Sequence, residues 1–228
     1  VRIPSGYCGV YAHKPTQGLI DTDQVVALSW TLDHVGVHAR SIEDCAALLD
    51  QASGGLSGDM GNEAFVAAPR SALGQAPLAV LDFAGQVEVE PAVQAAFDAT
   101  MARARAAGLT LETVRLDYDF GAMRSLGLLM SEAEGFVEHQ AMLAADPEGF
   151  TPGLRKLLTW GAEQPAWKLA KAYRELGEVA ARISEVLSPY EAVLMPTAPQ
   201  AAFAFETPAP ANQADFTALA DFLGLPAT

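Results

Sequence analysis

Residues 77–116 constrain the fold more than any other part of the sequence. Residues 77–83 form a short apolar run with the length of a buried strand. A helical pattern follows, with Pro91 at the favoured first position of the helix, and residues 109–116 read as a second strand. Two strands joined by a helix run parallel with a right-handed crossover. The sequence therefore predicts a βαβ unit and an α/β fold.

A largely helical region is expected over residues 121–187. Residues 121–145 show a helical apolar pattern, which breaks at residues 146–149. Residues 165–187 carry the clearest amphipathic pattern of the chain, and we expect one unbroken helix there. Its apolar face is formed by Leu169, Ala172, Tyr173, Leu176, Ala180, Ile183 and Leu187.

The N-terminal residues show a different pattern. Residues 1–3 read as a short strand that ends at Pro4, and a bend of small residues leads to a second strand before Lys14. Further on, Ser41 is a plausible N-cap of a helix that ends near residue 53. Residues 54–75 are rich in glycine, alanine and serine, and we expect a surface excursion there.

Composition excludes several classes of protein. The chain has 228 residues, 50% of them hydrophobic, and a formal net charge of −14, which disfavours binding to nucleic acid. No apolar window is long enough to span a membrane, so no membrane association is expected. Only Cys8 and Cys45 occur, and we interpret both as free thiols in a cytoplasmic protein.

Several phrases of the sequence occur together in one known family. They are residues 1–4 (Val-Arg-Ile-Pro), 8–16 (ending in Lys-Pro-Thr), 32–44 (with Leu-Asp-His-Val-Gly), 190–199 (ending in Pro-Thr-Ala-Pro) and 223–227 (Leu-Gly-Leu-Pro-Ala). In type and order they resemble motifs of the amidase signature family of serine hydrolases. The matches extend over nearly the whole chain, which makes a chance resemblance hard to sustain.

This resemblance implies an incomplete amidase-signature domain. The expected fold is a mixed central sheet flanked by helices and incomplete at both ends. Its parts would be the post-nucleophile strands and helix (1–54), the βαβ unit (77–116), a helical substrate-side region (121–187), and a strand followed by a linker and helix (190–228). No cofactor and no metal are expected.

The resemblance also implies where the chemistry lies. Family members cleave a carboxamide with a nucleophilic serine, a bridging serine and a lysine, through an acyl-enzyme. The nucleophile would sit one residue before Val1, and the other two residues further upstream. No catalytic residue can therefore be assigned within the chain, and we expect the chain to be inactive alone. For the full-length parent protein, the expected partner is a small-molecule amide substrate.

Arg2 is the first residue to which the resemblance assigns a role. Directly behind the nucleophile, it is placed to pair with an acidic residue of the glycine-rich loop; a surface arginine is the alternative. Large side chains of the helical region could wall the acyl pocket, although core packing explains them equally well. They are Met130, Phe136, Met142, Phe150 and Trp160.

Four polar residues near the N-terminus could suggest other sites. We interpret Lys14 as part of a structural turn, and Ser5 as a partner of local backbone groups. His34 and His38 are spaced for metal binding in a helix, but they flank a glycine without a carboxylate cluster, so no zinc site is expected.

Acidic residues on the helix at 121–145 form a further group. Glu132, Glu134 and Glu138 fall near one another on it, and a solvated face is the expected reading. His139, on the same helix, is expected to be a surface or half-buried residue rather than a base.

Three functions stay open besides an unrelated α/β protein. The chain could be a fragment of an amidase, a truncated relative that serves as an interaction module, or a protein like the A subunit of the glutamine amidotransferases. Strand edges and apolar helix stripes left uncovered at the ends of the fragment predict a homodimer or larger assembly.

Overall fold

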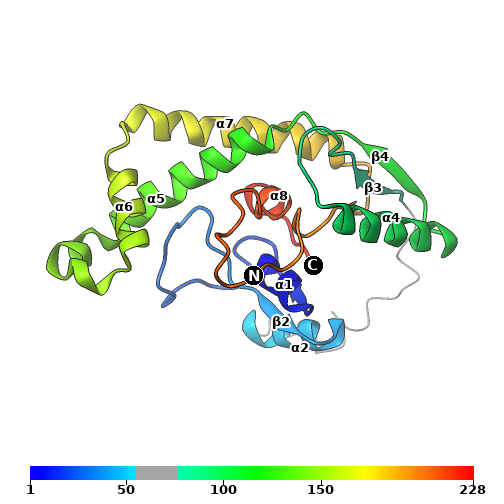
Figure 1. The fold of residues 1–228 in the computed structure, drawn as a ribbon, viewed down its shortest axis with the longest axis horizontal. Coiled ribbons are helices and arrows are strands. Elements are labelled where there is room, and N and C mark those ends of the chain that lie inside the picture. Colours follow the sequence, from blue (N-terminus) through cyan, green and yellow to red (C-terminus); the bar gives the residue numbers. More distant parts are fainter. Residues whose placement is uncertain (55–75) are drawn as a thin grey trace.

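Two small β-sheets and a layer of long helices organise the chain (Figure 1). The computed structural model describes residues 1–54 and 76–228, so the expected excursion at 54–75 lies almost wholly outside the described residues. The elements are α1 (Arg2–Cys8), β1 (Tyr11–His13), β2 (Val37–Ala39), α2 (Ile42–Ala52), β3 (Leu78–Leu81), α4 (Pro91–Ala106), β4 (Leu111–Val114), α5 (Phe120–Ala145), the 3₁₀ turn η3 (Pro147–Gly149), α6 (Pro152–Ala162), α7 (Ala166–Leu187), β5 (Val193–Leu194) and α8 (Asp215–Phe222).

The larger sheet contains the predicted βαβ unit. Its strand order is β4-β3-β5, and both pairings are parallel, with Leu78 opposite Leu111 and Ala79 opposite Val193. Helix α4 connects β3 to β4, and Pro91 occupies its first turn, where the missing N–H of proline leaves no hydrogen bond unmade. The βαβ prediction is confirmed, and β5 lies at one edge of the sheet.

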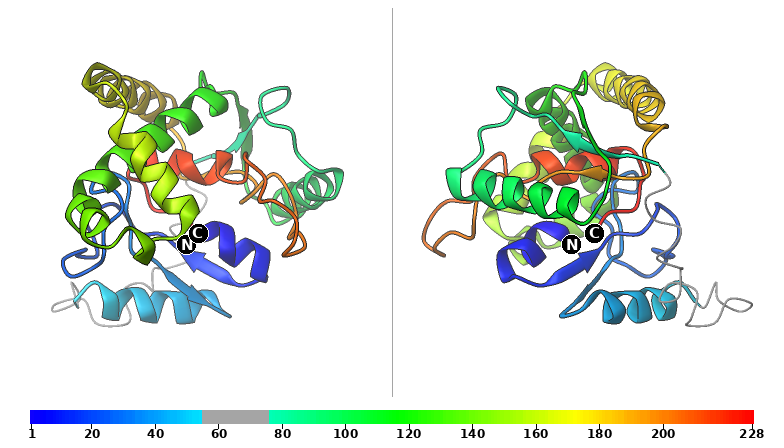
Figure 2. Two further views of the ribbon diagram at one scale, coloured as in Figure 1. Left: turned by 60° about the vertical axis from the view of Figure 1, so that its left-hand side comes forward. Right: turned by 90° about the vertical axis from the view of Figure 1, so that its right-hand side faces the viewer.

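The smaller sheet lies apart from the larger one. Strands β1 and β2 pair antiparallel, and a bridge between Lys14 and Ala227 extends this pair with the last residues of the chain. The N- and C-terminal ends consequently lie side by side, as all views in Figures 1 and 2 show. The described residues thus contain two small sheets with helices around them, an α/β architecture as expected. One mixed sheet in the whole parent protein stays a prediction.

The prediction of a strand at residues 1–3 was wrong. Residues 2–8 form helix α1, and Pro4 falls in its first turn, where backbone N–H groups have no partner within the helix. Proline there marks the beginning of a helix as readily as the end of a strand. Gly9 ends the helix with a positive φ of 66°, a conformation that glycine adopts without steric cost.

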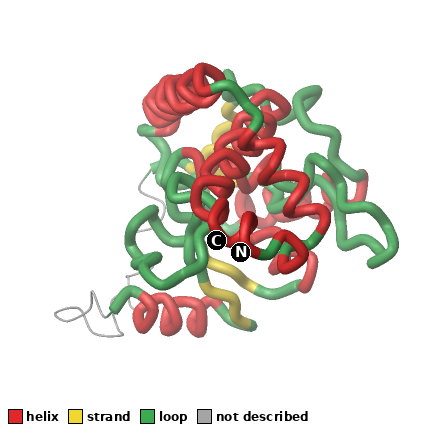
Figure 3. The backbone as a smooth tube through the Cα atoms, turned by 90° about the vertical axis from the view of Figure 1, so that its left-hand side faces the viewer, coloured by secondary structure: helices red, strands yellow, loops and turns green. Residues whose placement is uncertain are grey.

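Helices α5, α6 and α7 form a helical layer along the top and left of Figure 1, away from α2, and Figure 3 shows the molecule from that left-hand side. Helix α7 is unbroken over Ala166–Leu187, as predicted, and α5 packs against α6, α7 and α8. Helices α5 and α6 approach closely at Gly161, where a Cβ atom would lie 2.3 Å from the carbonyl oxygen of Glu132. The tight contact leaves no room for a larger residue there.

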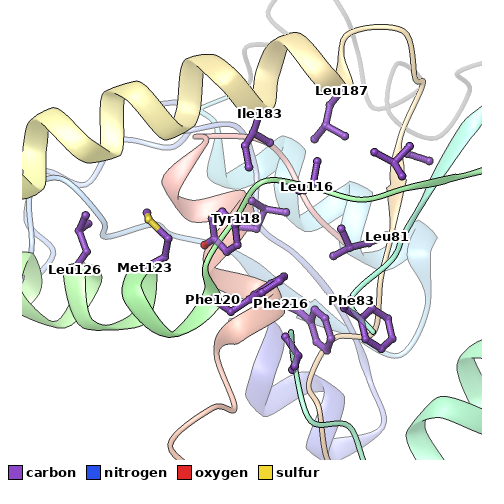
Figure 4. Packing of buried hydrophobic residues seen from close by; sticks show 14 of the residues in the cluster. Leu81, Phe83, Leu116, Tyr118, Phe120, Met123, Leu126, Ile183, Leu187 and Phe216 are labelled. Carbon is purple, nitrogen blue, oxygen red and sulfur yellow. The ribbon is translucent and has the colours of Figure 1, made fainter. Parts of the chain in front are cut away.

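The main core joins this layer to the parallel sheet and α8 (Figure 4). Phe216 is its centre: its ring lies 5.0 Å from that of Phe83 and 5.9 Å from that of Phe120, in edge-to-face arrangements. Ile183 and Leu187 of α7 are buried in the same core. The α7 stripe is therefore covered within the chain, contrary to the expectation that it is exposed.

Candidate functional site

Arg2 connects the N-terminal helix to α8. The guanidinium is buried, and its Nη2 donates to the backbone oxygen of Thr217 at 2.6 Å and to Oδ1 of Asp221 at 2.9 Å. A surface arginine is therefore excluded. Its acidic partner in the described residues lies on α8, 219 positions away in sequence. The glycine-rich loop of the family would precede Val1, so pairing of Arg2 with that loop stays a prediction.

Lys14 is buried beside the same group of charges. Its ammonium donates to the backbone oxygen of Pro15 at 2.7 Å, and its own backbone N and O both bond to Ala227 at 2.8 Å. Burial lowers the pKa of Lys14 to about 8; Asp221 opposes this shift and Arg2 adds to it. Lys14 itself lies in the bridge to Ala227, and the turn follows at residues 16–19 rather than at Lys14. Its side chain carries a buried charge that this backbone arrangement does not require.

The loop between β1 and β2 reaches this charge cluster through His34. Oδ2 of Asp33 accepts hydrogen bonds from the backbone N–H groups of Leu28 and Ser29, which holds a tight turn. His34 donates from Nδ1 to the backbone oxygen of Leu32 at 2.7 Å, and the same nitrogen lies 4.0 Å from Asp221. No cluster of metal ligands forms anywhere in residues 1–54 and 76–228.

A cavity of about 290 Å³ opens between α5, α8 and this loop. Its walls include Leu32, Tyr118, Phe120, Arg124, Gly127, Asp215, Ala218, Asp221 and Phe222. Arg124 closes one side through two bonds of 2.8 Å to the carboxylate of Asp215. Because Asp221 also binds Arg2, the cavity adjoins the segment that would follow the nucleophile.

Tyr118 lines this cavity and carries an unpaired, buried hydroxyl. Its side chain is only 3% exposed, and its hydroxyl is buried without a hydrogen-bond partner in the described residues. Burial raises the pKa of Tyr118 well above its usual range, and Asp215 and Asp221 raise it further. The phenol therefore stays protonated and keeps a donor without an acceptor, which is costly for a buried group.

The five side chains expected to wall a pocket do not line this cavity. Met130 is completely buried in the main core, so the core interpretation is the right one for it. Met142 is 58% exposed and Trp160 is partly exposed, while the ring of Phe150 packs on His139. Phe136 is half-buried. Apart from Met130, which lies on the core side of α5, these residues lie farther along α5 and on the segments after it, whereas the cavity is formed by the first half of α5.

Two interpretations of polar residues were wrong. Ser5 is buried and contacts Nδ1 of His38 instead of local backbone groups. Glu132 and Glu134 are 5% and 0% exposed, so they do not form a solvated face. The helix is covered on that side by α6 and by the loop before β2, a covering that the helical pattern alone could not reveal.

Sequence reasoning missed the residues that make the cavity polar. Asp215 and Asp221 lie in the short helix at residues 215–222, which is otherwise mostly apolar. Acidic side chains within an apolar helix signal either exposure or pairing with a buried cation. That pattern could have singled them out, although not their partners Arg124 and Arg2.

The comparisons with known proteins agree on one family. The family model described as Amidase matches residues 1–228. The chain is 28% identical over 234 positions to the A subunit of a glutamyl-tRNA(Gln) amidotransferase from Exiguobacterium sp., covering 89% of this chain and 48% of that protein. It is 29% identical over 212 positions to an amidase from Pseudomonas putida, covering 87% of this chain and 44% of the relative.

A solved structure shows the same fold. The crystal structure of an amidase superposes with a TM-score of 0.82 at 22% identity, covering 99% of this chain and 51% of the other. The chain thus spans about half the length of the relatives it matches. In the described residues, no helix combines the length and the apolar character needed to cross a membrane. The match over residues 1–228 establishes that the chain belongs to the amidase family.

Proposed function

We propose that this chain is the post-nucleophile half of an amidase that hydrolyses a small carboxamide through a serine acyl-enzyme. The serine would directly precede Val1, and the lysine and bridging serine would lie further upstream. The chain alone is then inactive, because it holds neither nucleophile nor base. Its contribution is to support the nucleophile from behind and to bind the acyl part of the substrate.

The cavity between α5 and α8 is the observation that carries this proposal. It adjoins Asp221, whose carboxylate binds Arg2, two residues after the proposed serine. Its walls combine the aromatic rings of Phe120 and Phe222 with the unpartnered hydroxyl of Tyr118. Largely apolar walls with a few convergent polar groups are typical of small-ligand sites. An apolar or aromatic acyl group with one hydrogen-bond acceptor suits these walls.

Binding of phenylacetamide to the chain tests the cavity. We expect saturable shifts of the cavity residues by NMR, and loss of binding when Ala218→Leu fills the space. Tyr118→Phe removes only the hydroxyl and should weaken binding by about 0.5–1.5 kcal/mol, without lowering the stability of the fold. Tyr190→Phe is the matched control, because that hydroxyl lies outside the cavity on Glu112. Wild-type affinity for phenylacetamide in all three variants would refute the assignment of this cavity as the acyl site.

A fluorophosphonate probe tests the position of the nucleophile. Such probes label the activated serine of serine hydrolases. In a form extended upstream by its own reading frame, we expect the label on the residue directly before Val1. The chain of 228 residues should stay unlabelled. A label on Ser5 would overturn the proposed position.

The role of a glutamine-amidotransferase A subunit is the second candidate. A segment of 54 residues is 48% identical to the A subunit, numbered 1, of a glutamyl-tRNA(Gln) amidotransferase from Clostridium acetobutylicum. The net charge of −14 argues against a role beside tRNA. Glutaminase activity of the extended form that rises on addition of the other amidotransferase subunits would favour this candidate over a stand-alone amidase.

A further inference from the structure

Glu134 is a fully buried carboxylate at the centre of the helical layer. Its Oε2 accepts from the hydroxyl of Ser29 at 2.6 Å and from the backbone N–H of Thr31 at 3.0 Å, while the hydroxyl of Tyr173 donates to Oε1. The carboxylate on α5 therefore holds both the loop before β2 and helix α7. A buried carboxylate needs such donors, since its desolvation is otherwise uncompensated.

The neighbours of Glu134 on α5 hold the same loop. A Cβ atom at Gly135 would lie 2.6 Å from Cδ1 of Leu28 and 3.0 Å from its backbone oxygen, so the loop backbone rests directly on the helix. One turn further, Nε2 of His139 donates to the backbone oxygen of Ala27 at 2.7 Å. The loop is thus attached to α5 at three consecutive places.

The contact with Ser29 continues to the cavity. The hydroxyl of Ser29 donates to Glu134 and accepts from the backbone N–H of Leu32 at 3.0 Å. Leu32 lines the cavity between α5 and α8, and its backbone oxygen orients His34 near Asp221. A displacement of the carboxylate would therefore move one wall of the cavity as well as His34, which lies 4.0 Å from Asp221.

We infer that Glu134 is a positioning residue, which sets the Leu32 wall of the acyl cavity through Ser29 and Thr31 and couples it to α7 through Tyr173. The inference rests on the proposed function for the nature of the ligand. It assigns Glu134 no contact with substrate.

Substitution by glutamine separates charge from geometry. An amide has one accepting oxygen and one donating nitrogen. The N–H of Thr31 can only donate, so the amide oxygen must face the loop. The hydroxyl of Tyr173 can turn and accept from the amide nitrogen instead. The pKa of Tyr173 is raised to about 12, mainly by burial and secondly by its hydrogen bond to the Glu134 carboxylate. We expect this pKa to fall in Glu134→Gln, because the charge beside the phenol is removed.

The experiment compares Glu134→Leu and Glu134→Gln with Glu138→Gln, an exposed position on the same helix. Amide hydrogen exchange of Thr31 and Leu32 reports the loop, and phenylacetamide affinity reports the cavity. In Glu134→Leu we expect the hydrogen-exchange rates of both amides, and the Kd for phenylacetamide, to rise at least tenfold. Glu134→Gln should keep both within threefold of wild type while the pKa of Tyr173 falls, and Glu138→Gln should change none of the three.

The possible failures are distinguishable. A wild-type chain that does not bind phenylacetamide contradicts the proposed function, whereas amide exchange still decides the positioning role. Folded Glu134→Leu with wild-type exchange at Leu32 would overturn the inference. Should Glu134→Leu not fold, Ser29→Ala removes the hydroxyl that connects Glu134 to Leu32. Faster exchange at Thr31, whose N–H bonds to Glu134 and not to Ser29, supports the inference, and unchanged exchange at Thr31 overturns it.

Discussion

Removal of the buried charge at Lys14 should change how the stability of the chain depends on pH. The side chain is 2% exposed, and burial lowers its pKa from 10.5 to about 8. The unfolded chain therefore holds this proton more tightly than the folded chain. Below pH 8 the lysine is charged in both states, and the cost of burying it is fully present.

The free energy of unfolding contributed by Lys14 should rise as pH increases from about 8 towards 10.5. In this window the folded state releases the proton while the unfolded state keeps it, so deprotonation favours folding. The full shift corresponds to about 3 kcal/mol, at 1.36 kcal/mol for each pKa unit. Between pH 7 and 10 we expect the wild type to gain about 2 kcal/mol relative to Lys14→Met.

Urea unfolding of both proteins, followed by far-UV circular dichroism at pH 7, 8, 9 and 10, measures this difference. Tyrosines and cysteines that titrate in the same range do so in both proteins, and they cancel in the comparison. The reasoning would be refuted if the difference in unfolding free energy between wild type and Lys14→Met stayed constant within about 0.5 kcal/mol from pH 7 to 10. That result would mean that the ammonium of Lys14 is solvated in the folded state.

Three other outcomes are expected. Arg2→Met should destabilise the chain by about 2–4 kcal/mol in urea unfolding, since it leaves Asp221 and the Thr217 oxygen without their donor, and a change below about 0.5 kcal/mol would contradict this. We propose self-association through the outer edge of β5; light scattering should show a dimer that Leu194→Lys weakens, and a monodisperse monomer at micromolar concentration would exclude it. Purified chain should not hydrolyse simple carboxamides; a rate lost in Ser5→Ala would show that the nucleophile was misplaced.

The elements predicted with success are those in which local interactions decide the structure. The βαβ unit at residues 77–116 and the helix at residues 166–187 carry their own apolar periodicity, and Ser41 caps its helix by accepting from Asp44 as expected. The sequence motifs by themselves indicated the family to which the chain belongs. Periodicity and capping act over a few residues, so they can be read from neighbours in sequence.

Only the tertiary structure decided the site. Arg2 pairs across 219 positions with Asp221, and Glu134 across 105 positions with Ser29. Whether a carboxylate on a helix faces water or a loop depends on what else packs there, and the pattern of the helix itself carries no such information. The sequence alone determined most helices and strands and the family. The burial and pairing of charges depended on segments that only the fold brings together, because the energy of a charge is set by all its neighbours in space.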